Sequence, residues 1–326
     1  MNITIVNPSK IPALLYGGTE RVIWYLGKEL VKLGHKVRYL VDEGSSCDFA
    51  EVLILDSRKE FNAQIPEDTD IVHFNFPVDE EIDKPYVITI HGNSSPGQVF
   101  HENSIFVSQN HARRHNSDSF VYNGLDWDDY GDTNFVKKDE YFHFLANAAW
   151  KVKNLKGAIK ACSQAGKKLA VMGGTRLNFK MGFRFTTNRN VKFHGMIGGG
   201  EKADLLRGSR GLIFPVLWDE PFGLAITESM YFGCPVFGTK YGSLPELVNE
   251  NTGFLSNKIS EVAEVLENVN SYKRRQISDY AIENFNSKKM ALEYFKKYET
   301  VLNGKPLNTS KPKYLPELNE KIFKFD

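Results

Sequence analysis

Short apolar segments alternate with stretches of helical periodicity along this chain, and that alternation limits the fold more than any other feature of the sequence. The first apolar segment, residues 3–6, has the length of a buried strand. Apolar residues then recur at helical spacing at Val22, Leu26, Leu30 and Leu33. Gly34 provides a helix stop, and a second strand, residues 36–41, follows directly. The pattern predicts a β-α-β unit, whose two strands are parallel.

The same alternation continues through the rest of the chain. Further strands are predicted at residues 52–55, 71–74, 87–90, 105–107 and 120–122. The rhythm restarts after the Gly- and Asp-rich stretch 124–132, with strands at residues 141–145, 169–172, 191–194, 212–214 and 235–237. Helices are predicted between these strands near residues 201–206 and 224–232. The fold class is therefore α/β, with two Rossmann-like, doubly wound parallel sheets.

The restart of the rhythm predicts the domain organisation. An N-terminal domain is expected over residues 1–135 and a C-terminal domain over residues 136–286. Residues 287–326 are expected to form a helix over 288–302 and a polar, Pro-punctuated tail that pack back toward the N-terminal domain. A length of 326 residues suits two domains, each with its own core.

The composition argues against several classes of protein. A net charge of +1 and a pI near 7.7 disfavour a protein dedicated to nucleic acids or anionic membranes, although local basic patches stay open. Three distant cysteines, Cys47, Cys162 and Cys234, support neither a disulfide framework nor a zinc site. The sequence predicts no signal peptide and no membrane-spanning segment. We therefore expect a cytoplasmic protein, with a peripheral position at a membrane left open.

The segment EPFGLAITE carries the sharpest functional signal. It follows the predicted strand 212–214, so Glu220 and Glu228 are expected at the edge of the sheet where ligands bind in open α/β folds. Gly223 lets the backbone approach a ligand closely. The next helix begins with the backbone amides of Phe222, Gly223 and Leu224. Such amides attract phosphate or sugar oxygens. A carboxylate at each end of the segment can take paired hydroxyl groups.

Several segments in order resemble family 4 of the retaining glycosyltransferases, through nearly the whole chain. They read YGGTERVIWYLGKELVKLGHKV, DIVHFN, VITIHG, VYNGLD, KNLKGAIKA, VKFHG, LIFPVLWDEPFGLAITESMYFGCPVFG, YGSLPELV and GFL. The resemblance implies the GT-B architecture of two facing Rossmann-like domains. It also implies a nucleotide-diphosphate sugar as co-substrate and no further cofactor.

The resemblance implies roles for individual residues as well. Glu220 would contact the donor sugar, and Glu228 the ribose hydroxyl groups. The amides from Phe222 to Leu224 would lie near the sugar and the diphosphate. Gly17 and Gly18 would approach the same diphosphate from the N-terminal domain.

Two further positions follow from the same resemblance. His91 comes directly after the strand 87–90 and would face the donor, where it orients the sugar or stabilises charge at the anomeric centre. His91 and Glu220 are thus the expected catalytic residues. Met196 would contact the nucleotide base.

One position departs from the pattern of the family. The family has Gly-Arg at the end of the first C-terminal strand and a lysine five residues later, both cations binding the donor diphosphate. Here the two pairs read Asn147-Ala148 and Lys153-Asn154. Lys153 is therefore retained and the arginine is lost, with Lys151 as the nearest possible substitute.

The histidines do not predict a metal site. His111 and His115 are four positions apart, with His101 upstream, but Arg113 and Arg114 between them indicate a solvated basic helix. We therefore expect catalysis without a metal ion and no metal ligands in the chain.

These features together predict a retaining glycosyltransferase that moves a hexose-type sugar from a UDP- or GDP-sugar to a saccharide or glycoconjugate acceptor, as in polysaccharide biosynthesis. Three alternatives stay open. A nucleotide-sugar epimerase shares the fold. A transferase with a nucleic acid acceptor, acting on modified DNA, is disfavoured by the near-neutral charge. Ala148 makes a degenerate nucleotide-sugar-binding protein conceivable.

Overall fold

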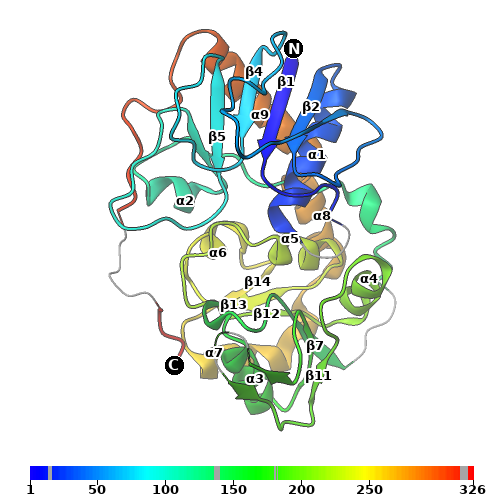
Figure 1. Cartoon of the computed structure of the whole chain (residues 1–326). Helices are drawn as coiled ribbons and strands as arrows, with labels where there is room; N and C mark the ends of the chain where they lie inside the picture. The colour runs from blue at the N-terminus through cyan, green and yellow to red at the C-terminus, as the bar shows by residue number, and fades with distance from the viewer. Residues whose placement is uncertain (14–16, 136–139, 180, 182, 316–321) are drawn as a thin grey trace. The chain divides into compact units, whose positions relative to one another are not determined.

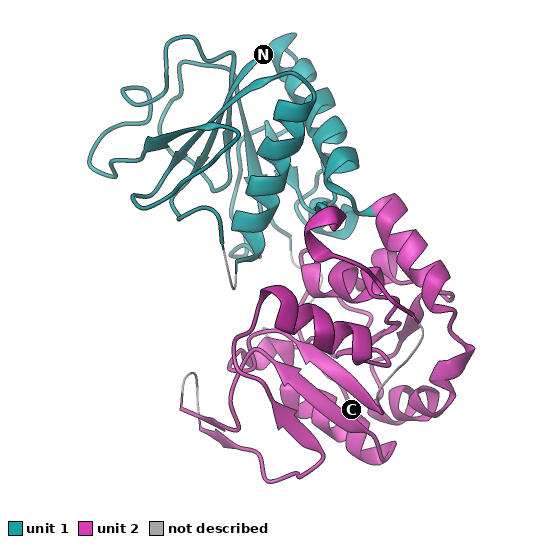
Figure 2. Ribbon diagram, turned by 90° about the vertical axis from the view of Figure 1, so that its right-hand side faces the viewer, with its two compact units in different colours: residues 1–126, 285–318 teal, residues 127–284, 319–326 magenta. Residues whose placement is uncertain are grey.

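The computed structural model describes residues 1–13, 17–135, 140–179, 181, 183–315 and 322–326. The chain forms two compact units (Figure 2): unit 1 comprises residues 1–126 and 285–318, and unit 2 comprises residues 127–284 and 319–326. The sequence predicts the first boundary after residue 135, whereas the structure places it after residue 126. The Trp127 ring stacks on Tyr231, with ring centroids 4.6 Å apart. This aromatic contact explains why the chain joins unit 2 before the acidic stretch ends.

Unit 1 is built on a six-stranded parallel sheet. Its strands are β1 (Asn2–Asn7), β2 (Lys36–Val41), β3 (Glu51–Ile54), β4 (Ile71–Phe74), β5 (Tyr86–Ile90) and β6 (Ser104–Phe106). They pair in the order β3-β2-β1-β4-β5-β6. The strand order reverses between β1 and β4, which is where open α/β sheets bind ligands at the carboxyl ends of their strands.

The strand predicted at residues 120–122 is wrong. Within the described chain this segment forms no strand, and Phe120 makes an isolated bridge with Phe106. Just beyond it, Gly124 passes so close to Asn286 that a Cβ atom at this position would lie 2.2 Å from the Asn286 carbonyl oxygen. The chain therefore turns against the start of the C-terminal helix instead of extending along the sheet.

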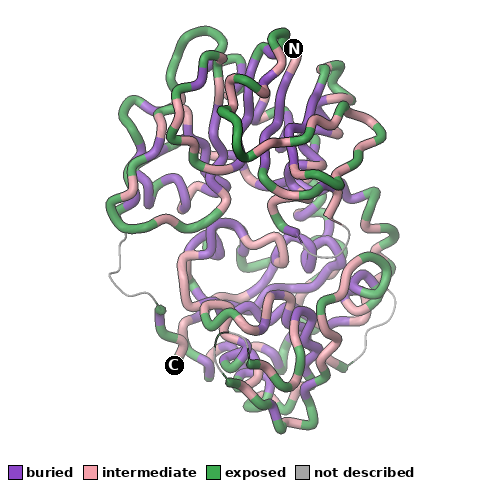
Figure 3. Tube along the Cα trace, in the orientation of Figure 1, coloured by how far each residue is buried: buried purple, intermediate pink, exposed green. Residues whose placement is uncertain are grey.

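Two long helices cover unit 1. Helix α1 (Gly18–Lys32) buries Val22, Leu26 and Leu30 of the predicted apolar stripe, whereas Leu33 follows the helix and is exposed. Helix α9 (Ser287–Leu302) packs against α1 and β5 although it lies far along the chain (Figure 1). Helix α9 brings two buried tyrosines to the sheet. The Tyr298 hydroxyl lies 2.7 Å from Nδ1 of His73, and the Thr89 hydroxyl donates to the Tyr294 hydroxyl at 3.1 Å. Figure 3 shows the strands of this unit largely buried and the connecting loops exposed.

We expect the Tyr298→Phe substitution to destabilise unit 1 by about 1–3 kcal/mol, because a buried partner of His73 is removed. Burial lowers the pKa of His73 to about 3, so the ring is neutral near pH 7 and needs this hydrogen bond to satisfy its polar atoms. Urea unfolding followed by circular dichroism measures the effect. Tyr272→Phe, which removes the hydroxyl group of a half-buried tyrosine in unit 2, is the matched control. It should change the free energy of unfolding by less than about 0.5 kcal/mol. Equal effects in both variants would contradict the specific role of Tyr298.

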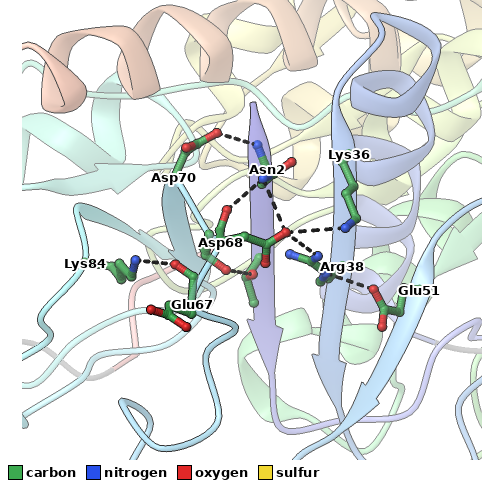
Figure 4. Close-up of polar contacts among 10 residues, drawn as sticks. Asn2, Lys36, Arg38, Glu51, Glu67, Asp68, Asp70 and Lys84 are labelled. Carbon is green, nitrogen blue, oxygen red and sulfur yellow. Dashed lines mark hydrogen bonds and ion pairs between the residues drawn. The ribbon is translucent and has the colours of Figure 1, made fainter.

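The amino ends of β1, β2 and β4 are joined by polar contacts (Figure 4). The buried Arg38 guanidinium bridges Glu51 and Asp68, with both N–O distances at 2.8 Å. The Asn2 amide donates to Asp70 at 2.6 Å, and its side chain donates to the Asp68 carbonyl oxygen at 2.7 Å. These contacts fix strand register at the edge opposite to the carboxyl ends of the strands.

Unit 2 repeats the same topology. Its parallel strands are β7 (Tyr141–Leu145), β8 (Lys168–Met172), β11 (Val191–Phe193), β12 (Leu212–Phe214), β13 (Val236–Gly238) and β14 (Gly253–Leu255). They pair in the order β11-β8-β7-β12-β13-β14. The helices of the unit are α3 (Leu155–Gln164), α4 (Gly199–Gly208), α5 (Leu224–Tyr231), α6 (Leu244–Leu247), α7 (Ile259–Val265) and α8 (Arg274–Asn284). Two parallel α/β sheets of Rossmann type confirm the predicted fold class.

Candidate active site

The strand order of unit 2 reverses between β7 and β12, and the segments that follow these two strands form the candidate site. The 3₁₀ helix η2 (Lys151–Lys153) follows β7, and the loop that leads to α5 follows β12. The Leu217 amide donates to the Val152 carbonyl oxygen at 2.7 Å, and the Asn154 side chain donates to the Pro215 carbonyl oxygen at 2.9 Å. The two segments are therefore fixed against each other.

Glu220 forms a buried ion pair in this loop. Lys153 Nζ lies 2.8 Å and 2.6 Å from the two carboxylate oxygens of Glu220, and Trp218 Nε1 donates to the same carboxylate at 2.6 Å. The Lys153 ammonium group also lies 4.9 Å from the centroid of the Trp218 ring. Glu220 is 5% exposed, so its charge is held by a fixed cation and a fixed donor instead of by water.

A neighbouring turn supports the Glu220 loop from behind. The Ser243 amide donates to the Glu220 carbonyl oxygen at 2.9 Å, and the Ser243 hydroxyl donates to the Phe222 carbonyl oxygen at 2.8 Å. Gly242 has φ +63°, and a Cβ atom at this position would lie 2.1 Å from the Glu220 amide nitrogen. Glycine is thus required here, and Gly242 and Ser243 hold the Glu220 loop in place.

Gly223 precedes α5 as its N-cap and has a left-handed conformation, with φ 85° and ψ 73°. This conformation turns the chain sharply from the Glu220 loop into the helix. The Phe222 side chain is buried, so the part of Phe222 that faces a ligand in the prediction is its backbone. Gly223 and Leu224 lie at the positive end of the helix, which suits an anion.

Glu228 lies one turn further along α5 and forms a second buried ion pair. Lys202 Nζ of α4 lies 2.5 Å from Oε1 of Glu228, and the Tyr130 hydroxyl donates to the same oxygen at 2.9 Å. The Lys202 ammonium group lies 5.6 Å from the Tyr130 ring centroid. Glu228 is 3% exposed and Lys202 is 8% exposed. Lys202 and Tyr130 were not predicted, because nothing in their local sequence links them to a glutamate so far along the chain.

Ala148, the position at which an arginine was expected, is contacted by an arginine from a distant part of unit 2. Arg184 Nη1 donates to the Ala148 carbonyl oxygen at 2.6 Å. Ala148 packs beside Gly174, where a Cβ atom would lie 2.6 Å from the Ala148 methyl group. Lys151, the predicted substitute, is exposed at the start of η2. The structure thus places the guanidinium group of Arg184 at Ala148, the position where an arginine is expected and absent. The sequence did not predict this contact.

Met196 follows the edge strand β11 and is 45% exposed. The preceding residue, Gly195, has φ 75°, and its carbonyl oxygen accepts a hydrogen bond from the Gly173 amide at 2.6 Å. A bridge between Gly174 and Gly195 joins the ends of β8 and β11. Met196 therefore stands at the carboxyl edge of the unit 2 sheet.

The remaining candidates belong to unit 1. His91 follows β5, and its Nε2 atom lies 2.9 Å from Oδ1 of Asn75. Desolvation lowers the pKa of His91 to about 4, so the ring is neutral near pH 7. Gly17 is buried before α1, and a Cβ atom there would lie 2.6 Å from the Ala13 side chain, while Gly18 is exposed as the first residue of α1. All three lie at the carboxyl edge of the unit 1 sheet.

The solvated basic helix predicted around His111 and His115 is wrong. His111, Arg114 and His115 are buried, whereas Arg113 is exposed. The His115 ring stacks on Phe106 with centroids 4.3 Å apart, and its Nδ1 atom lies 2.7 Å from the His111 carbonyl oxygen. Burial lowers the pKa of His115 to about 4. The C-terminal tail adds cover, since the Lys313 amide donates to the His115 carbonyl oxygen at 2.8 Å.

Within the described ranges, no group of three or more His, Cys, Asp and Glu side chains is arranged to hold a metal ion. The two glutamates of the candidate site are instead each paired with a lysine. The site as described therefore supplies carboxylates, ammonium groups and a helix N-terminus. This combination suits a ligand that carries both phosphate and hydroxyl groups.

Residues 127–284 match the family model described as glycosyl transferases group 1. The matched residues coincide with the contiguous part of unit 2, which holds both buried glutamates. No curated protein sequence matches the chain. The two sheets have the fold of GT-B glycosyltransferase structures, and unit 2 is similar to the glycosyl transferases group 1 family.

Several solved structures share the fold at low sequence identity. AviGT4, a glycosyltransferase involved in avilamycin A biosynthesis, is 18% identical with a TM-score of 0.76, covering 93% of this chain and 98% of its own. The sucrose-phosphate synthase of Thermosynechococcus elongatus is 15% identical with a TM-score of 0.70, covering 93% and 99%. Anabaena HepE, solved in complex with UDP-glucose, is 17% identical with a TM-score of 0.68, covering 92% and 100%.

Proposed function

We propose that this chain is a metal-independent retaining glycosyltransferase of family 4, which transfers a hexose-type sugar from a UDP- or GDP-sugar to a saccharide or glycoconjugate acceptor. The observation that carries the proposal is the pair of buried glutamates, Glu220 and Glu228, at the two ends of one loop-helix segment. The complex of HepE with UDP-glucose supports a nucleotide-sugar donor for this fold.

Glu220 is proposed to accept hydrogen bonds from hydroxyl groups of the donor sugar. Its ion pair with Lys153 and its bond from Trp218 hold the carboxylate in one orientation before the substrate arrives. A fixed carboxylate costs no reorganisation when charge develops at the anomeric carbon, and this is the basis of electrostatic catalysis. Glu228, held by Lys202, is proposed to bind the ribose hydroxyl groups.

The donor diphosphate is proposed to lie between the start of α5 and the lysines after β7. The amides of Phe222, Gly223 and Leu224 and the charges of Lys151 and Lys153 would neutralise the leaving group. Met196 would lie against the base.

Unit 1 is proposed to orient the donor. Gly17 and Gly18 would let the backbone approach the diphosphate. His91 is neutral near pH 7, so it would act through hydrogen bonding and not through a positive charge. Retention is proposed to arise because the leaving phosphate and the acceptor hydroxyl share one face of the sugar.

A donor screen tests the proposal. The pure protein is incubated with UDP-, GDP-, ADP- and CMP-sugars, and mass spectrometry follows the released nucleotide. Release of UDP or GDP from one sugar, with retained anomeric configuration in the product by NMR, is the expected result. Conversion of the nucleotide sugar without release would identify an epimerase. Tight binding with no turnover across a broad panel of acceptors would identify a degenerate binding protein.

We further expect turnover to be unchanged in an excess of EDTA, because Lys153, Lys151 and the helix N-terminus supply the positive charge that a metal ion would otherwise provide. The measurement is the rate of nucleotide release with EDTA and with added Mg²⁺ or Mn²⁺. Activity that disappears with EDTA and returns with a divalent ion would refute the metal-independent mechanism.

A further inference from the structure

The charge of unit 2 is distributed unevenly along the chain. No Asp or Glu occurs in residues 141–200, although the chain as a whole has a net charge of +1. The same stretch contains Lys151, Lys153, Lys156, Lys160, Lys167, Lys168, Arg176, Lys180, Arg184, Arg189 and Lys192. One part of unit 2 is therefore strongly basic, and the rest of the chain is acidic overall.

A small two-stranded hairpin interrupts this basic stretch. Strands β9 (Leu177–Asn178) and β10 (Arg184–Phe185) pair in antiparallel register, with Leu177 opposite Phe185 and Asn178 opposite Arg184. The hairpin is a sheet of its own and does not extend the six-stranded sheet of unit 2. Side chains alternate between the two faces of such a ribbon. Its two faces differ sharply in character.

The outer face of the hairpin is apolar and exposed. Leu177 is 44% exposed, Phe179 73%, Phe183 70% and Phe185 56%. The Phe179 and Phe183 rings lie side by side, with centroids 5.8 Å apart. Met181 at the tip is also exposed. A contiguous group of large apolar side chains in water marks a surface that binds something apolar.

The inner face is held by arginines. Arg184 donates to the carbonyl oxygens of Ala148 at 2.6 Å and Thr175 at 2.9 Å. Arg176 donates to the Thr186 carbonyl oxygen at 2.7 Å and to the Val191 carbonyl oxygen at 2.5 Å. Among the described residues of the hairpin, Arg176 and Arg184 thus face inward and the phenyl rings face outward, the reverse of an ordinary surface ribbon. The apolar exposure belongs to a fixed element and not to a loosely attached loop.

A basic pocket of about 540 Å³ adjoins the base of the hairpin. Its lining includes Arg176, Arg189 and Lys192, together with Phe193, and no acidic side chain. Arg189 and Lys192 are exposed. Such a pocket suits the phosphate of an anionic group, close to side chains that prefer an apolar medium.

We propose that the hairpin is a membrane-docking element that inserts Leu177, Phe179, Phe183 and Phe185 into the interface of an anionic phospholipid bilayer. Arg189 and Lys192 meet the lipid phosphates at the same time. Apolar insertion combined with basic residues is the pair of signals that gives stable peripheral binding. None of the helices in the described part of the chain has the length and apolarity to cross a bilayer. A second copy of the chain suits this face less well, because two strongly basic surfaces would repel each other.

The test is cosedimentation of the full chain with vesicles of phosphatidylcholine alone or with about 30% phosphatidylglycerol, a fraction typical for testing anionic-lipid preference. We expect wild-type protein to bind the anionic vesicles, and to bind them less at high salt. The double variant Phe179→Thr/Phe183→Thr should bind the anionic vesicles with an affinity lower by about tenfold or more. Ile54→Thr is the matched control, since Ile54 is an exposed apolar residue on a strand of unit 1, at 51% exposure. Its binding should equal that of the wild type.

Two further sets of variants test the proposal even if the double Phe variant folds poorly. Arg189→Gln/Lys192→Gln should remove the preference for anionic over neutral vesicles. Phe179→Trp should show fluorescence quenching by lipids brominated along their acyl chains. Wild-type protein that stays in the supernatant, or a Phe179→Trp signal without quenching, overturns the proposal. A concentration-dependent dimer abolished by the double Phe variant would overturn it in favour of a second copy of the chain. The readouts are independent of turnover, so failure here and failure of the proposed transferase activity are distinguishable.

Discussion

Replacing Glu220 with glutamine is expected to lower kcat by about 10²–10³-fold, the usual cost of losing one fixed electrostatic contact to a transition state. The carboxylate is held in one orientation by Lys153 and Trp218 and is buried, so water screens its contact with the sugar only weakly. Glutamine keeps the shape and a hydrogen-bond acceptor but loses the charge. The Kd for the nucleoside diphosphate should change by less than about threefold, or under 1 kcal/mol, because the proposed contact is to the sugar.

The measurement is steady-state turnover with the donor that the screen identifies, together with calorimetry for nucleotide binding. Glu246→Gln is the matched control, since Glu246 is a half-buried carboxylate on α6 that is assigned no contact with substrate. A Lys153→Met variant and the double variant complete a cycle. If the ion pair acts as a unit, the two losses are far from additive. Wild-type turnover in Glu220→Gln would end its assignment as a catalytic residue.

Replacing Glu228 with alanine is expected to raise the Kd for the nucleoside diphosphate by about 10- to 100-fold, or about 1.4–2.8 kcal/mol. Ribose hydroxyl groups would lose a charged acceptor, and hydrogen bonds to charged groups contribute about 1.5–3 kcal/mol each. The variant also leaves Lys202 without its carboxylate in a buried position. The variant therefore has a structural effect as well as an effect on binding, and the experiment must separate the two.

Binding of a 2′-deoxy nucleotide separates the loss of the ribose contact from the structural effect. Wild-type protein should bind the ribonucleotide more tightly than its 2′-deoxy analogue, and Glu228→Ala should bind the two with equal affinity. Lys202→Met perturbs the same ion pair without removing the proposed acceptor, so it should weaken binding and yet retain the preference for ribose. If Glu228→Ala still discriminates between the two sugars, the contact with ribose does not exist. Thermal unfolding of each variant reports the structural part.

The sequence predicted those elements whose pattern is local. Alternating apolar strands and the stripe on α1 were sufficient to predict the parallel sheets, and the helix predicted over residues 288–302 corresponds to α9 (Ser287–Leu302). Strand β14 and helix α8 were not predicted. Strand β14 is three residues long, and α8 carries a mainly polar sequence in which a weak apolar stripe is hard to recognise.

The parts of the candidate site that lie within one sequence segment could be predicted. The contacts between residues far apart in the sequence could not. The Glu220 loop and the start of α5 were predicted from EPFGLAITE. The partner of Glu228, Lys202, comes from another helix, and Arg184 reaches Ala148 from a hairpin. Such pairs depend on the sheet topology that brings them together. The burial of His115 likewise depends on the tail, which lies almost two hundred residues further along the chain.

The interrupted layout of unit 1 has a consequence for how the protein is made. Residues 1–126 of unit 1 are synthesised before unit 2, but unit 1 lacks α9 until residues 287–302 have been synthesised. Residues 127–284 are contiguous and form nearly all of unit 2. At typical synthesis rates that segment takes on the order of ten to thirty seconds. Throughout this time His73 and Thr89 lack the two tyrosines that satisfy them in the finished fold. The unit that starts first is therefore completed last, and its uncovered sheet is the surface that a nascent-chain chaperone would protect.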